Sequence, residues 1–166
     1  TTGLLTMEFQ GRDKAQNYGL SIDSALYQIA SPNSFNRFTS PSGISEITIP
    51  PGSLTQETGI IIMEFDPTGL NRARKWQILP TISLSPELLQ FDKPASIKFI
   101  INNSILELAE FWQIEINRET NGGWESIPTE YKDGYVISNI NNFGDYSVFV
   151  NLDAEYEEVN LLPENF

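Results

Sequence analysis

Residues 47–54 read Ile-Thr-Ile-Pro-Pro-Gly-Ser-Leu, and this stretch is the strongest indication of the fold. Apolar and polar residues alternate up to this point, so that Ser45, Ile47 and Ile49 fall on one face of a strand. The strand must end at the Pro50–Pro51 pair, because proline has no backbone N–H to donate to a neighbouring strand. A half-buried strand that stops at a double proline is typical of the end of a β-sandwich.

Similar patterns predict strands along most of the chain. Residues 95–101 alternate between apolar and polar types, and residues 60–65 are apolar on both faces except for Glu64, as in a central strand. Asn121-Gly122-Gly123 and Asp133-Gly134 tolerate positive φ, so they predict tight hairpins within a meander. The predicted strands are 4–9, 21–30, 44–49, 60–65, 76–78, 81–84, 95–101, 111–118, 124–131, 135–140 and 146–150.

Helical signals are few. Ser104 followed by Glu107 is a capping-box pattern, which predicts one or two helical turns. The chain is therefore expected to be all-β, as a two-layer antiparallel β-sandwich with at most one or two short helical turns. Its 166 residues suit one domain, which we place at 1–152. Residues 153–166 form an acidic and apolar tail, expected to dock on its own sandwich or on a neighbouring subunit.

The large aromatic residues are expected to fill or cover the core. Trp112 is in phase with the apolar residues that follow it, and Trp124 begins a strand after a turn, so both indoles are predicted to be core groups. The polar loop 31–43 carries Phe35 and Phe38, which we expect to lie over the core as lids. The alternative for these two rings is exposure for stacking on a ligand.

Composition excludes several classes of function. The formal net charge of -12 repels phosphate backbones, so nucleic acid is not an expected partner. Cysteine and histidine are both absent, which removes disulfides, thiolate nucleophiles, Cys/His zinc sites and imidazole bases. The sequence also has no apolar run of about 18 residues that would span a bilayer. A chain without cysteine that starts at Thr1 is compatible with an exported protein, and we expect an extracytoplasmic, secreted or cell-surface location.

The order of several short motifs resembles the ZU5-type β-sandwich, in the divergent form found in bacterial surface proteins and lipoproteins. The resemblance covers about residues 41–150. Domains of this family mostly mediate protein contacts in larger assemblies, which is the function that the resemblance implies. The motifs are 47–54, 82–86 leading through 91–94 to the strand 95–101, 124–128 and 142–148.

Some relatives in that family cleave themselves at a His-Phe-Ser sequence near the closing strand. Asn142-Phe143-Gly144 occupies that place here, so both the histidine and the serine are missing. Self-cleavage is therefore not expected.

The candidate contact residues lie in a basic cluster and in the tail. Arg72, Arg74 and Lys75 flank Trp76 and form the only basic cluster of an acidic protein. One interpretation is a strand-edge tryptophan covered by arginine stems. The other is a partner-binding patch that receives an acidic tail from another copy, since the charges are complementary. The apolar tail residues predicted to bind a partner are Leu161, Leu162 and Phe166.

Metal and enzyme chemistry have little support. Asp133, Asp145, Asp153 and Glu155 would have to converge to bind calcium, and no local Asp-x-Asp-x-Asp run delivers the six to eight oxygens that calcium needs. No Ser-x-x-Lys or Gly-x-Ser-x-Gly arrangement is present. We therefore predict a protein that is not an enzyme, with no metal site and no cofactor.

The sequence favours a non-catalytic exported interaction or assembly module. Such a module would be a surface or fibre subunit that contacts other proteins, including copies of itself, through edge strands and termini. The alternative is a carbohydrate-binding module of a surface protein, in which Trp76 stacks on a glycan.

Overall fold

The structure is a computed structural model of the chain, and it describes residues 3–12, 18–65, 71–72, 75–87, 89–107, 109–121 and 123–154. For residues 4–12, 18–24 and 71–72 it describes the backbone alone. The elements are β1 (Gly3–Arg12), β2 (Tyr18–Ala30), β3 (Asn36–Thr39), β4 (Ser45–Ile49), β5 (Thr58–Phe65), β6 (Asn71–Arg72), β7 (Lys75–Gln77), β8 (Thr81–Ser85), β9 (Gln90–Ile100), α1 (Asn103–Leu106), a 3₁₀ turn (Phe111–Gln113), β10 (Ile114–Thr120), β11 (Gly123–Ser126), β12 (Glu130–Lys132), β13 (Tyr135–Asn142) and β14 (Asp145–Asn151).

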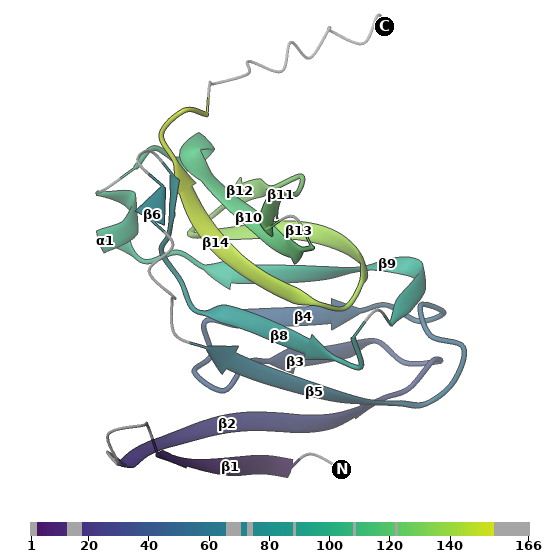
Figure 1. Cartoon of the computed structure of the whole chain (residues 1–166). Coiled ribbons are helices and arrows are strands. Elements are labelled where there is room, and N and C mark those ends of the chain that lie inside the picture. The colour runs from purple at the N-terminus through teal and green to yellow at the C-terminus, as the bar shows by residue number, and fades with distance from the viewer. Residues whose placement is uncertain are drawn as a thin grey trace, which may run out of the picture.

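Two antiparallel sheets pack face to face, as predicted for a β-sandwich (Figure 1). The larger sheet has the order β1-β2-β5-β8-β14-β10-β11, and β7 also pairs with β14 and carries β6 on its other side. The smaller sheet has the order β12-β13-β9-β4-β3. The only helical elements in the part of the chain that is described are α1 and the 3₁₀ turn.

The core lies between the two inner faces. In β4, Ser45, Ile47 and Ile49 are buried and alternate with half-buried residues, which confirms the pattern seen before the double proline. In β9 the same holds for Ala95, Ile97 and Phe99. The largest of the fully buried side chains are Tyr146, Phe99, Phe143, Ile47, Ile49, Ile60, Ile62, Ile82, Leu84, Ile97, Ile116 and Val136.

The strand β5 is central, between β2 and β8, as its apolar sequence indicates. Its one acidic residue, Glu64, lies opposite Ile82 and accepts hydrogen bonds from Ser42, whose N–H is 3.1 Å from Oε2 and whose Oγ is 2.8 Å from Oε1. Ser42 belongs to the loop between β3 and β4 of the smaller sheet. Glu64 therefore ties the two sheets together at one end of the sandwich.

The predicted meander over 111–140 is wrong in one respect. Both hairpins are present, and the second has Asp133 at φ 45 and Gly134 at φ 85, as a tight turn requires. However, β11 lies in the larger sheet and β12 in the smaller one, so residues 127–129 cross between the layers. We call residues 127–129 the crossover.

Three local predictions also need correction. Trp112 and Trp124 are only half-buried: Trp112 lies in the 3₁₀ turn before β10, and Trp124 lies on the edge strand β11, with its ring 5.3 Å from that of Phe149. The N-cap of α1 is Asn102, whose Oδ1 accepts from the N–H of Ile105, so the helical turn begins before Ser104. An Asn at the N-cap serves as well as Ser.

The loop 31–43 contains an extra short strand, β3. Phe38 of β3 is 5% exposed and covers the core as expected, whereas Phe35 is 65% exposed. The ring of Phe35 therefore fits the alternative of an exposed aromatic.

A buried polar network closes the interruption between β7 and β8. Both strands pair with the same edge of β14, and Pro80 separates them. Gln77 Nε2 donates to Leu79 O at 2.9 Å and to Ser147 Oγ at 2.9 Å, and Ser147 Oγ donates to Leu79 O at 2.8 Å. These side chains replace the ladder hydrogen bonds that the interruption removes.

Substitution of Ser147 by alanine should lower the free energy of unfolding by about 1–3 kcal/mol, because the buried groups around it lose their partners. Urea unfolding measures this change. Ser83→Ala on β8, a half-buried serine on the same face, is the control and should change stability by less than about 0.5 kcal/mol. Equal effects of the two variants would show that the network does not hold the interruption.

Candidate interaction surface

The predicted basic cluster is only partly described, and its lysine is paired within the chain. Arg72 ends β6 and lies opposite Lys75, while Arg74, Leu161, Leu162 and Phe166 lie outside the described residues. Lys75 Nζ is 2.9 Å from Glu115 Oε2 and 5.7 Å from the ring centroid of Phe149. Trp76 is half-buried opposite Val150. A contact patch at this cluster stays a prediction. Because Lys75 is paired with Glu115, its charge would contribute little to binding an acidic partner.

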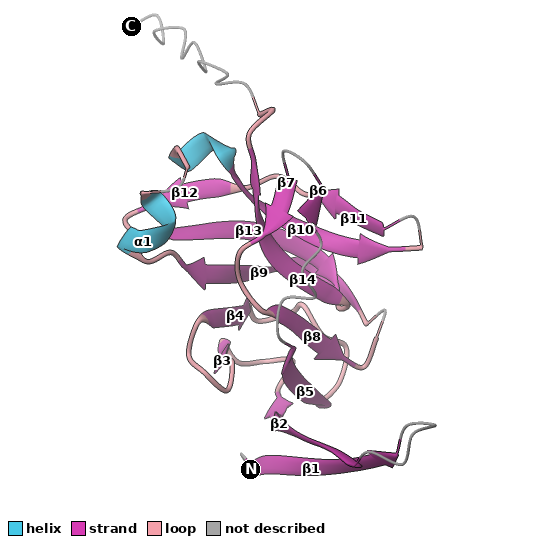
Figure 2. Cartoon of the chain, turned by 60° about the vertical axis from the view of Figure 1, so that its left-hand side comes forward, coloured by secondary structure: helices cyan, strands magenta, loops and turns pink. Residues whose placement is uncertain are grey.

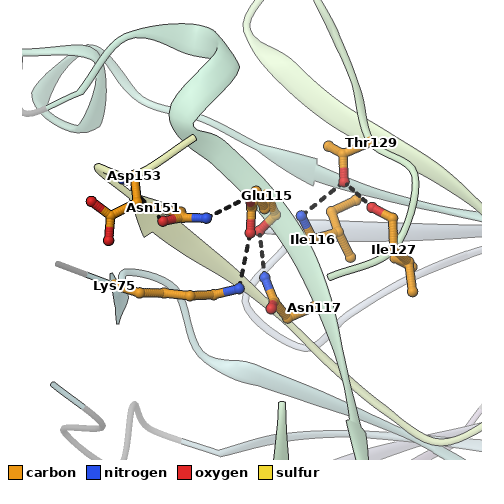
Figure 3. A network of polar contacts seen from close by, with 8 residues as sticks. All are labelled: Lys75, Glu115, Ile116, Asn117, Ile127, Thr129, Asn151 and Asp153. Atoms are coloured by element: carbon orange, nitrogen blue, oxygen red, sulfur yellow. Dashed lines mark hydrogen bonds and ion pairs between the residues drawn. The ribbon is translucent and has the colours of Figure 1, made fainter. Parts of the chain in front are cut away.

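A polar network fixes the end of β14 and the residues that follow it (Figure 3). Besides Lys75, Glu115 accepts a hydrogen bond from Asn151 Nδ2 at 2.9 Å. The Oδ1 atom of Asn151 accepts from the N–H of Asp153 at 3.1 Å, and its backbone oxygen accepts from the N–H of Ala154 at 3.1 Å. The chain is therefore held against β10 and β7 as far as residue 154.

The network lowers the pKa of Glu115 below 4.5. Burial alone would raise this pKa, but the hydrogen bonds from Asn151 and Lys75 and the positive charge of Lys75 outweigh it. A lowered pKa in the folded state means that the carboxylate stabilises the fold above pH 4.5, and that this stabilisation is lost as pH falls through the folded-state pKa.

The variant Glu115→Gln should therefore unfold more easily than the native chain at pH 7, by about 1–3 kcal/mol. The difference should shrink as the pH falls below 4.5 and the native carboxylate becomes protonated. Denaturant titrations between pH 3 and pH 7 measure it. Glu130→Gln, at an exposed position of β12, should be close to neutral throughout. A pH-independent loss for Glu115→Gln would contradict the assignment.

The crossover is pinned to β10. Thr129 Oγ1 accepts the N–H of Ile116 at 2.9 Å and donates to Ile127 O at 2.8 Å, and the N–H of Ile127 bonds to Ile116 O at 3.0 Å (Figure 3). A hollow lies on each side of this pinned segment.

The first hollow is aromatic, with a volume of about 670 Å³. Phe111 is 45% exposed, and its ring centroid lies 5.1 Å from that of Trp112 and 5.6 Å from that of Tyr131. We call it the aromatic hollow. Its lining comprises Phe111, Trp112, Ile114, Glu115, Ser126, Ile127, Pro128, Thr129, Tyr131 and Ala154. The sequence analysis did not predict this hollow. The adjacent pair Phe111-Trp112 could have indicated it, because two neighbouring aromatic residues at a turn cannot both enter the core.

The polar groups that line the aromatic hollow already have partners. Glu115 bonds to Lys75 and Asn151, and its carboxylate also accepts a hydrogen bond from Ser126. Thr129 Oγ1 donates its proton to Ile127 O within the crossover and accepts the N–H of Ile116 on β10. What the hollow offers a ligand is therefore mainly apolar ring surface.

The second hollow, of about 640 Å³, lies on the other side of the crossover, and Arg118 of β10 and Tyr146 of β14 line it. The hydroxyl of Tyr146 donates to Asn142 O at 2.7 Å, and burial raises the pKa of Tyr146 to about 12, although the positive charge of Arg118 opposes the rise. Arg118 Nε is buried without a hydrogen-bond partner within the described residues. This hollow thus places a positive charge beside mostly neutral side chains.

Among the acidic residues that the structure describes, two come together as a pair. Glu119 of β10 faces Asp145 of β14, and the pKa of Glu119 is raised above 4.5 by burial, by the negative charge of Asp145 and by a hydrogen bond to Asp145 that only the protonated form can donate. Within the described ranges, no three acidic side chains come close enough to hold a metal ion. Asp133 lies in the β12–β13 turn and Asp153 in the network at the end of β14, while Glu155 is outside the described residues.

Replacing Glu119 with glutamine should raise the thermal midpoint at pH 7, because it removes the repulsion from Asp145. A raised pKa means that the protonated form favours folding, so the native chain loses this contribution as pH rises through the folded-state pKa. The gain should therefore shrink as the pH falls through the raised folded-state pKa of Glu119. Glu57→Gln in an exposed loop is the control. A lower midpoint for Glu119→Gln at pH 7 would contradict this account.

An edge strand and an apolar sheet face lie at the opposite side of the larger sheet. β1 pairs with β2 over ten consecutive positions and, among the described strands, with no other. Only residues 25–30 of β2 pair with β5, so the rest of the β1–β2 hairpin projects beyond the sandwich (Figure 2). Side chains on the outer face of β2 and β5 form what we call the outer apolar face: Tyr27, Ile29, Ile61, Met63 and Phe65.

Three large side chains of the outer apolar face are exposed to solvent. Tyr27 is 39% exposed, Ile29 42% and Phe65 39%. The Tyr27 ring lies across Gly59 of β5, where an added Cβ would be 2.7 Å from the tyrosine oxygen. Neighbouring exposed apolar residues on one sheet face mark an interaction site more often than scattered ones do.

The comparisons with known proteins assign no family to this chain. No protein-family model matches the sequence, and no curated protein matches it. In the part of the chain that the structure covers, no helix is long and apolar enough to cross a membrane.

Proposed function

We propose that the protein is a non-catalytic interaction or assembly module of ZU5-like type that acts outside the cytoplasm. It contacts copies of itself, as a surface or fibre subunit does, through the β1 edge and the outer apolar face. The observation that supports this most is the position of an apolar face immediately beside a long edge strand.

Edge strands normally carry features that prevent pairing with other chains, such as short length, proline, bulges or inward charges. β1 is ten residues long and pairs with β2 without a register shift. Its other edge pairs with none of the described strands, so it can add a strand from another molecule through main-chain hydrogen bonds. The outer apolar face supplies the buried area that strand addition alone lacks.

The net charge affects how such contacts form. Copies with a formal charge of -12 repel one another, so association must depend on apolar burial and backbone hydrogen bonds. Added salt screens the repulsion. The proposal therefore implies association that strengthens between low and moderate salt.

Sedimentation equilibrium across protein concentration and salt tests the proposal. The native chain should associate, and Ile29→Lys should weaken association at least about tenfold, because it places a charge in the apolar contact. Ile100→Lys is the matched control, since Ile100 is 53% exposed on β9 of the smaller sheet. A native chain that stays monomeric, or equal effects of the two lysine variants, would overturn the proposal.

Carbohydrate binding is the second candidate, and the aromatic hollow is the observation that favours it. Trp76 and Tyr131 are both half-buried, whereas Phe111 is 45% exposed, so the stacking platform would be Phe111, with Tyr131 beside it. Sugar recognition also needs polar groups that are free to read hydroxyls. Because Glu115 and Thr129 are already bonded within the chain, the hollow supports this function less well than the outer apolar face supports assembly.

A further inference from the structure

We propose that the side chains of Lys75 and Asn151 become joined by an amide bond, with loss of ammonia and with Glu115 as the group that transfers protons. The bond links β7 covalently to the end of β14. It is independent of the proposed assembly through the β1 edge and the outer apolar face.

The register of two neighbouring strands brings the reacting groups together. β7 and β14 are antiparallel, and Lys75 lies directly opposite Asn151. Directly opposite residues have their side chains on the same face of the sheet, with Cβ atoms roughly 5 Å apart. The amine and the amide are therefore neighbours on one face.

A single carboxylate binds both nitrogens. Lys75 Nζ is 2.9 Å from Glu115 Oε2, and Asn151 Nδ2 is 2.9 Å from Glu115 Oε1 (Figure 3). The nucleophile and the leaving group are thus held by the two oxygens of one side chain. Glu115 can accept a proton from the amine and give one to the departing nitrogen, as a general base and acid must.

The carbonyl of Asn151 is polarised by a backbone donor. Its Oδ1 accepts the N–H of Asp153 at 3.1 Å. A donor at this position stabilises the negative charge that develops on a carbonyl oxygen during nucleophilic attack, as in an oxyanion hole. The amine, the carboxylate, the amide and the oxyanion donor are therefore all in place around one carbon atom.

The site is partly shielded from water. The side chains of Lys75 and Glu115 are 27% and 17% exposed, and the ring of Phe149 lies beside the amine, with its centroid 5.7 Å from Nζ. Removal of water disfavours the charged forms of both groups, so the uncharged amine, which is the nucleophile, becomes more accessible.

The reaction balances within these groups. The Lys75 ammonium passes a proton to Glu115 Oε2, and the neutral amine attacks Asn151 Cγ, so that a C–N bond forms and the carbonyl electron pair moves onto Oδ1. The bond from Cγ to Nδ2 then breaks, and Nδ2 leaves as ammonia with the proton from Glu115. Glu115 takes up a proton from the attacking nitrogen. Since one amide replaces another, no oxidant or reductant takes part.

Such a bond supplies a covalent cross-link to a chain that has no cysteine and therefore no disulfide. A link between residues 75 and 151 restricts the unfolded chain in the way that a disulfide does. The pH-dependent stability difference given above for Glu115→Gln refers to the chain before the bond forms, which its intact mass identifies.

The intact mass of the native chain tests the proposal without any substitution. It should be about 17 Da below the mass of the sequence, because one ammonia leaves. Trypsin should fail to cut the denatured chain after Lys75, and should release residues 75–98 joined to residues 133–166. The proposal is wrong if the folded chain keeps the full mass after prolonged incubation, or if the loss of ammonia maps elsewhere, such as to ring closure at Asn121.

Variants assign the three groups. Lys75→Arg, Glu115→Gln and Asn151→Ala should each keep the full mass of their sequences, with circular dichroism showing that they are folded. Lys98→Arg is the matched control, because Lys98 is also paired, at 3.1 Å, with a carboxylate, that of Glu46, to which no asparagine is hydrogen-bonded among the described residues. This variant should still lose ammonia. Loss of ammonia that persists in any of the first three variants would overturn the assignment.

Discussion

The larger sheet depends on how β14 pairs along both of its edges. One edge pairs with β10, and the other pairs with β8 and then, beyond Pro80, with β7. Backbone groups at that interruption are buried, so the fold requires substitutes for the missing ladder bonds. Gln77 and Ser147 provide them, and the inward side chains of the same strand, Val148 and Val150, are fully buried. Both the inner core and the outer polar network are therefore built on β14.

Alternation within single segments is what the sequence predicts best. The buried faces of β4 and β9, the central place of β5 and the Asp133-Gly134 hairpin all follow from local periodicity and turn chemistry. The assignment of β11 and β12 to different sheets does not, because a hairpin signal says which strands pair but not which layer the next strand joins. The same limit explains the tryptophans, whose burial depends on whether their strand or turn lies at an edge.

Contacts between residues far apart in the sequence could not be predicted from local patterns either. Lys75 and Glu115 are 40 positions apart, and nothing local to either residue predicts their ion pair. The pair changes how the basic cluster is interpreted, because it removes one of the three charges from the expected patch. The aromatic hollow likewise combines the turn before β10, the crossover, β12 and residue 154, which meet only in the folded chain. The two surfaces differ in shape: one combines an edge strand with a sheet face of aliphatic and aromatic side chains, and the other is a hollow lined by aromatic rings.

The close approach of Tyr27 to Gly59 has an evolutionary consequence. A methyl group at position 59 would overlap the phenol, so residue 59 can vary only if the side chain at position 27 is smaller or its ring moves. A lineage that acquires alanine or a larger residue at position 59 must first replace the tyrosine with a smaller side chain, or move its ring away from β5. Homologous sequences are therefore expected to show correlated substitution at positions 27 and 59, with a large residue at position 59 only where the residue at position 27 is small.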